Sequence, residues 1–187
     1  ILGHSMGAAI AALAAAAALA RVERLALLET LGPLAEAEEN TAHRLQQAVA
    51  ATRGRPGAPL RVFPELSVAV RARIQASPMD EAGARLLVER GTRAVEGGYA
   101  WRSDRRLVLP AATRLTEAQV RVLLAAVSCP VQVLYADPAQ PYFPEDVRHA
   151  RLDALPQAAL AVLPGGHHLH MDQPAAVAAV LGAFMAG

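Results

Sequence analysis

The pentapeptide Gly-His-Ser-Met-Gly at residues 3–7, with the apolar run that follows it from Ala8 to Ala20, decides the fold class of this 187-residue chain. It matches the pattern Gly-x-Ser-x-Gly, in which a serine occupies a strained strand-to-helix turn and exposes its hydroxyl. The flanking glycines allow the backbones to approach closely. We therefore expect a strand remnant, a tight turn and a buried helix over about residues 6–20, with Ser5 as the candidate nucleophile.

A serine hydroxyl is a weak nucleophile at neutral pH, so without a base Ser5 would be an idle residue in a turn. The candidate base is His167, which lies in Gly-Gly-His-His-Leu-His-Met-Asp-Gln-Pro at residues 165–174, directly after a predicted strand. Two alternatives are a zinc site built from His167, His168 and His170, or an inert capping role for these histidines. The spacing matches neither a helical His-x-x-x-His pair nor a Cys/His ribbon, so we expect no metal.

Further predicted strands and helices alternate along the chain. Short apolar or β-branched runs predict strands, and a capping box of Thr116 and Gln119 predicts the start of one helix. Strands that alternate with helices of this length form a parallel sheet with helices on both faces, which is the α/β class. The predicted strands are residues 25–28, 131–135 and 159–163, and the predicted helices are residues 116–127, 145–155 and 174–185.

The middle of the chain differs from both ends because polar and charged residues recur there at helical spacing. Residues 53–57 and the pair Gly97-Gly98 interrupt this pattern, and Ser77, followed by Pro78 and two acids, predicts the start of a helix. We interpret the segment as an inserted helical lid. The expected domains are a core of residues 1–34 and 111–187 and a lid of residues 35–110.

Composition excludes several classes of protein. The net charge is +1 and the 18 basic residues are interleaved with 17 acids, so we expect no nucleic-acid partner. The single cysteine, Cys129, is expected to be buried and inert, and it fits a reducing, cytoplasmic setting. The apolar run from Ala8 to Ala20 is too short to span a bilayer, and no basic residue precedes it, so we expect neither a signal peptide nor a membrane partner.

The motif at residues 3–7 and the pattern Gly-His-x-x-His-x-Asp-x-Pro at residues 166–174 together resemble the α/β-hydrolase superfamily. Trp-Arg-Ser-Asp at residues 101–104 and Leu-Thr-Glu-Ala-Gln-Val at residues 115–120 are similar to its serine hydrolase-like subgroup. The resemblance implies a partial α/β-hydrolase fold, because it begins at the nucleophile and the strands that precede that point in the family are expected to be missing. We expect this chain alone to be inactive.

The resemblance implies a Ser-His-acid triad with Ser5 as nucleophile and His167 as base, and it leaves two candidates for the acid. Most members carry the acid after the strand that corresponds to residues 131–135. The matching position in this chain is Ala139, and Asp137 lies two residues before it. Other members carry it after the preceding strand, where Glu29 stands. Both alternatives keep the chain order Ser, acid, His.

The expected function is a serine hydrolase that acts on a small-molecule carboxylic ester or related acyl compound and needs no cofactor. The backbone N–H of Met6 is the expected oxyanion donor. Trp101 and Tyr99, with Phe63 and Met79, line an acyl pocket in this interpretation, or else form the core of the lid. The alternatives are a non-catalytic binding protein of the same fold and an inactive fragment.

Overall fold

The computed structural model describes residues 1–53 and 61–186, which fall into two compact units. The first unit, here called the core unit, comprises Ile1–Glu38 and the described chain from Arg114 onward. The second, here called the cap unit, comprises Glu39–Thr113.

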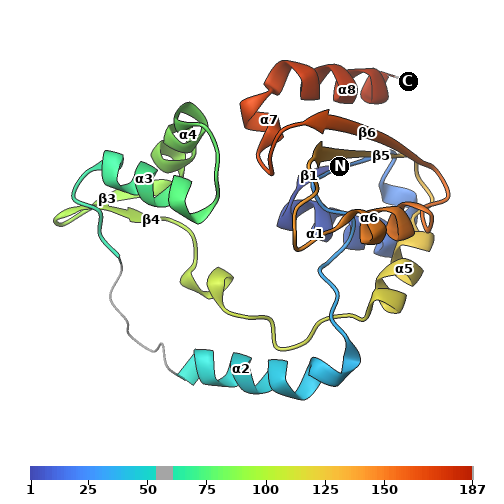
Figure 1. The fold of residues 1–187 in the computed structure, drawn as a ribbon, viewed down its shortest axis with the longest axis horizontal. Helices are drawn as coiled ribbons and strands as arrows, with labels where there is room; N and C mark the ends of the chain where they lie inside the picture. The colour runs from blue at the N-terminus through green and yellow to red at the C-terminus, as the bar shows by residue number, and fades with distance from the viewer. Residues whose placement is uncertain (54–60, 187) are drawn as a thin grey trace. The chain divides into compact units, whose positions relative to one another are not determined.

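The core unit is built on a four-stranded sheet in the order β1-β2-β5-β6, in which every neighbouring pair is parallel. Figure 1 labels three of these strands, β1, β5 and β6. Leu27 lies opposite Gly3 on one side and Val133 on the other. All carboxyl ends of parallel strands meet at one edge of the sheet, so the loops after these strands share that edge. The strands are β1 (Leu2–His4), β2 (Leu25–Leu28), β5 (Val131–Asp137) and β6 (Ala158–Pro164).

Helices cover both faces of this sheet. Leu27 and Val133 pack in a cluster with residues of α1, α5 and α6, whereas Leu28 and Leu134 pack on the opposite face with α7 and α8. A sheet covered in this way needs apolar residues on both faces, and all four residues of β2 are buried. The expected α/β fold is thus confirmed. The helices are α1 (Met6–Ala17), α5 (Glu117–Ala125), α6 (Glu145–Leu152), α7 (Leu169–Asp172) and α8 (Pro174–Ala186).

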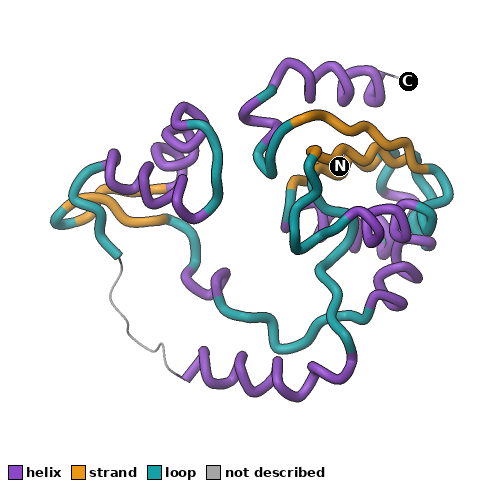
Figure 2. Tube along the Cα trace, in the orientation of Figure 1, coloured by secondary structure: helices purple, strands orange, loops and turns teal. Residues whose placement is uncertain are grey.

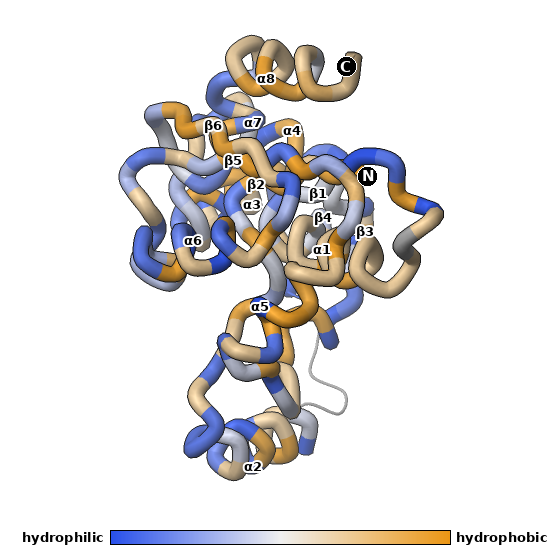
Figure 3. The backbone as a smooth tube through the Cα atoms, turned by 90° about the vertical axis from the view of Figure 1, so that its right-hand side faces the viewer, coloured by the Kyte–Doolittle hydropathy of each residue, from blue (hydrophilic) through white to orange (hydrophobic). Residues whose placement is uncertain are grey.

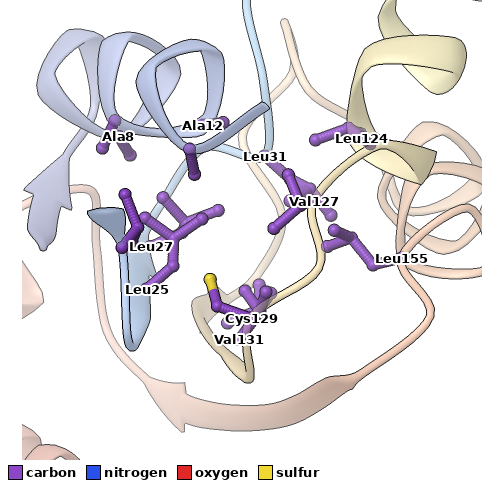
Figure 4. Packing of buried hydrophobic residues seen from close by; sticks show 14 of the residues in the cluster. Ala8, Ala12, Leu25, Leu27, Leu31, Leu124, Val127, Cys129, Val131 and Leu155 are labelled. Atoms are coloured by element: carbon purple, nitrogen blue, oxygen red, sulfur yellow. The ribbon is translucent and has the colours of Figure 1, made fainter. Parts of the chain in front are cut away.

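Helix α1 carries no charged side chain, and Figure 3 shows its tube in the hydrophobic colours. Ala8 and Ala12 bring it close to Leu25 and Leu27 of the sheet (Figure 4). The prediction that this helix reaches residue 20 is wrong: it ends at Ala17, and a 3₁₀ turn follows. Among the helices in the described part of the chain, none has the length and hydrophobicity that crossing a bilayer requires.

The sequence predicts a helical lid, but the cap unit also contains a two-stranded antiparallel hairpin (Figure 2). Gly97 and Gly98 were interpreted as a break between helices, but Gly97 lies in the hairpin turn and Gly98 begins β4, with φ values of 80° and 141°. A Cβ on Gly98 would lie 2.1 Å from the carbonyl oxygen of Phe63, so this turn requires glycine. The elements are α2 (Thr41–Arg53), α3 (Leu66–Ala76), α4 (Glu81–Gly91), β3 (Thr92–Val95) and β4 (Gly98–Trp101), with short 3₁₀ segments at Glu38–Asn40 and Arg105–Val108.

Two predicted helix starts have different outcomes. The capping box of Thr116 and Gln119 is confirmed, with both of its hydrogen bonds present. Ser77 does not cap α4, because it ends α3, and the carboxylate of Asp80 accepts a hydrogen bond from the N–H of Gly83 instead. The predicted break at residues 53–57 starts where α2 ends, at Arg53, and residues 54–57 lie outside the described chain.

Candidate active site

Ser5 occupies the turn between β1 and α1 with φ 53° and ψ −124°, a left-handed conformation that costs energy for a residue other than glycine. Its N–H donates to the carbonyl oxygen of Leu28 at 2.9 Å, and its carbonyl oxygen accepts from the N–H groups of Ala8 and Ala9. The turn can be this tight because Gly3 has no Cβ. A Cβ at this position would lie 2.5 Å from the carbonyl oxygen of Gly7. The sequence motif thus builds the turn that it predicts.

His167 lies in the turn after β6, with its side chain 15% exposed. Its Nε2 atom lies 2.9 Å from the Oγ of Ser5, although the two residues are 162 positions apart. Both residues follow the carboxyl end of a parallel strand, which explains how they meet at one edge of the sheet. The hydroxyl and the imidazole are within hydrogen-bond reach, the geometry that proton transfer between a nucleophile and its base requires.

Glu29 follows the last residue of β2 and is completely buried, with φ 61°. Its backbone N–H donates to the carbonyl oxygen of Leu134 at 2.9 Å, and its Oε1 atom accepts from the N–H of Ala136. Its Oε2 atom lies 3.5 Å from Nδ1 of His167. The carboxylate is thus turned inward, toward the imidazole nitrogen that does not face Ser5.

Asp137, the other candidate acid, is the last residue of β5 and is exposed. Its backbone carbonyl accepts a hydrogen bond from Gly165, in the turn that leads to His167. Within the described chain, no hydrogen bond or ion pair joins its carboxylate to the imidazole. The structure therefore brings Glu29, and not Asp137, against His167.

Arg148 of α6 is a buried cation beside this carboxylate, with its Nη2 atom 3.9 Å from Oε1 of Glu29. It donates through Nη1 to the carbonyl oxygen of Ala136 at 2.8 Å and through Nε to that of Phe143 at 3.1 Å. Its guanidinium stacks 4.4 Å above the ring of Tyr135. A buried carboxylate is costly without an opposite charge nearby, and Arg148 supplies that charge.

Tyr142 is a neighbour of His167 that the sequence analysis missed. Its hydroxyl lies 3.1 Å from Nδ1 of His167, and its ring stands edge-on to the imidazole. The loop between β5 and α6 is rich in proline and carries no periodic pattern. This loop follows the carboxyl end of a parallel strand, where functional residues gather, and that position is the signal that could have indicated Tyr142.

Three more histidines surround His167. The ring of His4 lies 4.8 Å from that of His167 and 4.1 Å from that of His170, and its Nε2 atom donates to the carbonyl oxygen of His167 at 2.7 Å. Burial lowers the pKa of His4 to about 4, and burial also lowers the pKa of His170. His168 is buried at the start of α7. In the described residues, no group of three or more His, Cys, Asp or Glu side chains is arranged to hold a metal ion.

Met6 is the first residue of α1, and its side chain is exposed. The first N–H groups of a helix have no carbonyl partner within the helix, and the helix dipole adds positive potential there. The Met6 N–H lies next to Ser5 in the chain, where an oxyanion would form.

Trp101 and Tyr99 belong to strand β4 of the cap unit. The Trp101 ring stands edge-on to that of Phe63 at 6.0 Å, and Tyr99 exchanges two backbone hydrogen bonds of 2.8 Å with the same residue. Trp101 and Met79 pack against the hydrophobic cluster that contains Phe63. Their contribution to an acyl pocket stays a prediction.

Comparisons with known proteins indicate the family of the chain. The model for the alpha/beta hydrolase family matches residues 1–180. A serine hydrolase-like protein of Dictyostelium discoideum is 29% identical over 190 residues, which cover 94% of this chain and 52% of that protein. The mouse serine hydrolase-like protein is 29% identical over 126 residues, which cover 59% of this chain and 40% of that protein. The chain thus spans about half the length, or less, of these curated relatives.

Two solved structures extend the comparison. The hypothetical protein PA1622 from Pseudomonas aeruginosa PAO1 is 39% identical with a TM-score of 0.88, and the match covers all of this chain and 67% of that one. The thioesterase domain from the curacin biosynthetic pathway is 27% identical with a TM-score of 0.77, and the match covers 96% of this chain and 65% of that domain. Because the family model matches residues 1–180 and the parallel sheet agrees with it, this chain belongs to the alpha/beta hydrolase family.

Proposed function

We propose that this protein is a serine hydrolase that cleaves carboxylic esters or thioesters through Ser5, His167 and Glu29. The observation that carries the proposal is the 2.9 Å separation between Oγ of Ser5 and Nε2 of His167. The strained turn at Ser5 supports it, because such strain concentrates at functional sites. The names of the serine hydrolase-like relatives and of the thioesterase domain support the acyl substrate class.

In the first half of the reaction, Oγ of Ser5 attacks the substrate carbonyl carbon while Nε2 of His167 takes the hydroxyl proton. The carbonyl oxygen becomes negatively charged and accepts the backbone N–H of Met6, an interaction of the kind that contributes about 3 kcal/mol to lowering a barrier. The imidazolium then gives its proton to the leaving alcohol or thiol. Ser5 is left as an acyl ester.

In the second half, His167 takes a proton from water, and the resulting hydroxide attacks the acyl ester. The proton returns to Ser5 as the acid product leaves. In both halves the buried carboxylate of Glu29 stabilises the transient imidazolium from the Nδ1 side. Arg148 supplies an opposite charge beside that carboxylate, with Nη2 3.9 Å from Oε1.

The test is active-site labelling of the product of the complete gene with a fluorophosphonate probe. We expect the wild type to be labelled at Ser5 and the Ser5→Ala variant not to be labelled. Ser128→Ala is the matched control, because Ser128 is exposed and lies before β5, at the opposite edge of the sheet. A folded wild type that takes up no label would favour a non-catalytic binding protein of this fold.

A further inference from the structure

Tyr142 lies in the loop between β5 and α6, the loop from which most members of the resembled superfamily supply their acid. Its side chain is half exposed, yet its hydroxyl oxygen is 3.1 Å from Nδ1 of His167. The nearest oxygen of Glu29 is 3.5 Å from the same nitrogen. Nδ1 therefore faces two oxygen atoms, of which the phenolic one is the nearer.

The tautomer of neutral His167 follows from its proposed role as a base. Nε2 must be free of hydrogen to receive the proton of Ser5, so the neutral ring carries its hydrogen on Nδ1. That N–H needs an acceptor. Glu29 already accepts from Ala136 through Oε1, and its Oε2 atom lies beyond ordinary N–H···O length from Nδ1. The oxygen of Tyr142 is at hydrogen-bond distance.

The loop holds Tyr142 in place through its neighbour, Phe143. Phe143 is buried, its ring stands edge-on to Tyr135, and its N–H donates to the carbonyl oxygen of Gln140 at 2.9 Å. Its own carbonyl oxygen accepts from Arg148. The same arginine therefore neutralises Glu29 and anchors the loop that presents Tyr142.

We propose that Tyr142 is a positioning residue, whose hydroxyl oxygen accepts the Nδ1–H of His167 and, together with Glu29, holds the imidazole in the tautomer that leaves Nε2 free. The inference rests on the proposed function. When His167 takes up the proton of Ser5, the positive charge on the ring strengthens the bond to the phenolic oxygen. Burial raises the pKa of Tyr142 above its usual value, so its hydroxyl stays neutral through the physiological range.

The experiment compares Tyr142→Phe with wild type by the rate of fluorophosphonate labelling of Ser5 as a function of pH. We expect labelling to be about three- to tenfold slower on the plateau, since one hydrogen bond to the transient imidazolium is lost. At low pH the labelling rate falls, and we call this part of the pH profile the acid limb. We expect the acid limb to move to lower pH in Tyr142→Phe, by up to about one unit, because protonated His167 loses a hydrogen-bond acceptor. Tyr135→Phe is the matched control, because it removes a buried hydroxyl that has no hydrogen-bond partner among the described residues.

Groups around His167 other than Tyr142 also influence the acid limb. They are Glu29, His4, His168 and His170. They are unchanged in Tyr142→Phe, so the difference between that variant and wild type isolates the hydroxyl at residue 142, and Tyr135→Phe gives the effect of removing a different tyrosine hydroxyl. Nitrogen-15 NMR of the histidine rings gives a second readout, in which Tyr142→Phe reduces the population of the Nδ1–H tautomer of His167.

Tyr142→Phe labelling with the rate and acid limb of wild type would overturn the inference. Faster labelling would also overturn it, because the hydroxyl would then be donating to Nδ1 and stabilising the unproductive tautomer. These results are distinct from failure of the proposed function, in which wild type itself is not labelled. In that case the NMR readout still tests the contact between Tyr142 and His167.

Discussion

Ser5 and Leu28 are joined by a backbone hydrogen bond of 2.9 Å, from the N–H of Ser5 to the last carbonyl of β2. Leu28 directly precedes Glu29, so this bond connects the turn that carries the hydroxyl to the turn that carries the carboxylate. Both groups are placed by backbone pairing of adjacent parallel strands, and His167 enters between them from the far strand β6.

The two candidate acids give the first prediction. Glu29→Gln keeps the shape of the side chain but removes its charge, so we expect the rate of ester hydrolysis or labelling to fall roughly 10²- to 10⁴-fold, as when other triads lose their acid. Asp137→Asn changes an exposed side chain and should leave the rate within about twofold. Steady-state kinetics on the two folded variants make the comparison. The opposite ranking would assign the acid to Asp137.

The two glycines of the motif give the second prediction. A Cβ at Gly3 would lie 2.5 Å from the carbonyl oxygen of Gly7 and 2.7 Å from the backbone of Ala8, whereas a Cβ at Gly7 meets nothing within 4 Å. Gly3→Ala should therefore lower the free energy of unfolding by about 1–3 kcal/mol. Gly7→Ala, inside α1, should be neutral or stabilising, since alanine favours a helix over glycine by about 0.5–1 kcal/mol. Chemical denaturation measures both, and equal losses would refute this account of the turn.

The buried arginine of α6 that faces the loop after β2 gives the third prediction. Arg151 is 1% exposed, pairs with Glu117 at 2.7 Å, and donates to the carbonyl oxygens of Leu31 and Pro33. Arg151→Met leaves those groups without their donor, so we expect a loss of about 3–5 kcal/mol in unfolding free energy. Arg106→Met, which breaks an exposed pair with Asp104, is the control and should have little effect. Comparable losses in the two variants would contradict the prediction.

The pH dependence of stability gives the fourth prediction. Burial lowers the pKa of His4 in the folded protein from 6.5 to about 4, so between these values the unfolded chain binds a proton that the folded chain does not. Stability should therefore fall as the pH drops from about 6.5 to about 4, and the lowered pKa of His170 acts in the same direction.

Thermal unfolding at pH 7 and at pH 4.5 measures this dependence, with His4→Gln as the matched variant. Its amide nitrogen can still donate to the carbonyl oxygen of His167, but the side chain does not titrate. The difference in Tm between the two pH values should be smaller in His4→Gln than in wild type. An unchanged difference would show that His4 does not contribute to the acid sensitivity.

Local sequence signals predicted the sheet of the core unit well. Strands β2, β5 and β6 are short apolar runs next to turn residues, and the capping box at Thr116 starts α5 as expected. The hairpin of the cap unit was missed because Gly97 and Gly98 were interpreted as a helix break. Glycine pairs end helices and form hairpin turns equally well. Here the residues on either side of the glycines pair with one another, and a bridge between Tyr99 and Phe63 adds a contact that is not local in sequence.

The site followed the same division. The motif around Ser5 and the glycines before His167 are local signals, and the structure places the Ser5 hydroxyl within 2.9 Å of the His167 imidazole. The choice between Glu29 and Asp137 depends on which side chain turns inward. The hydrogen bond from the N–H of Ala136, in the neighbouring strand β5, to Oε1 of Glu29 holds the Glu29 side chain inward. Tyr142 has no local signal, because its place beside His167 depends on Arg148 and Phe143 holding the loop.

In the described chain, Ser5 and Glu29 are the non-glycine residues with positive φ, and each directly follows one of two adjacent parallel strands. Glycine would relax the backbone at both positions. A laboratory selection for heat resistance alone would therefore be drawn toward replacing Ser5, whereas replacing Glu29 would also leave the buried Arg148 without its opposite charge. A variant selected for stability at Ser5 would therefore also have to be tested for the proposed hydrolase activity.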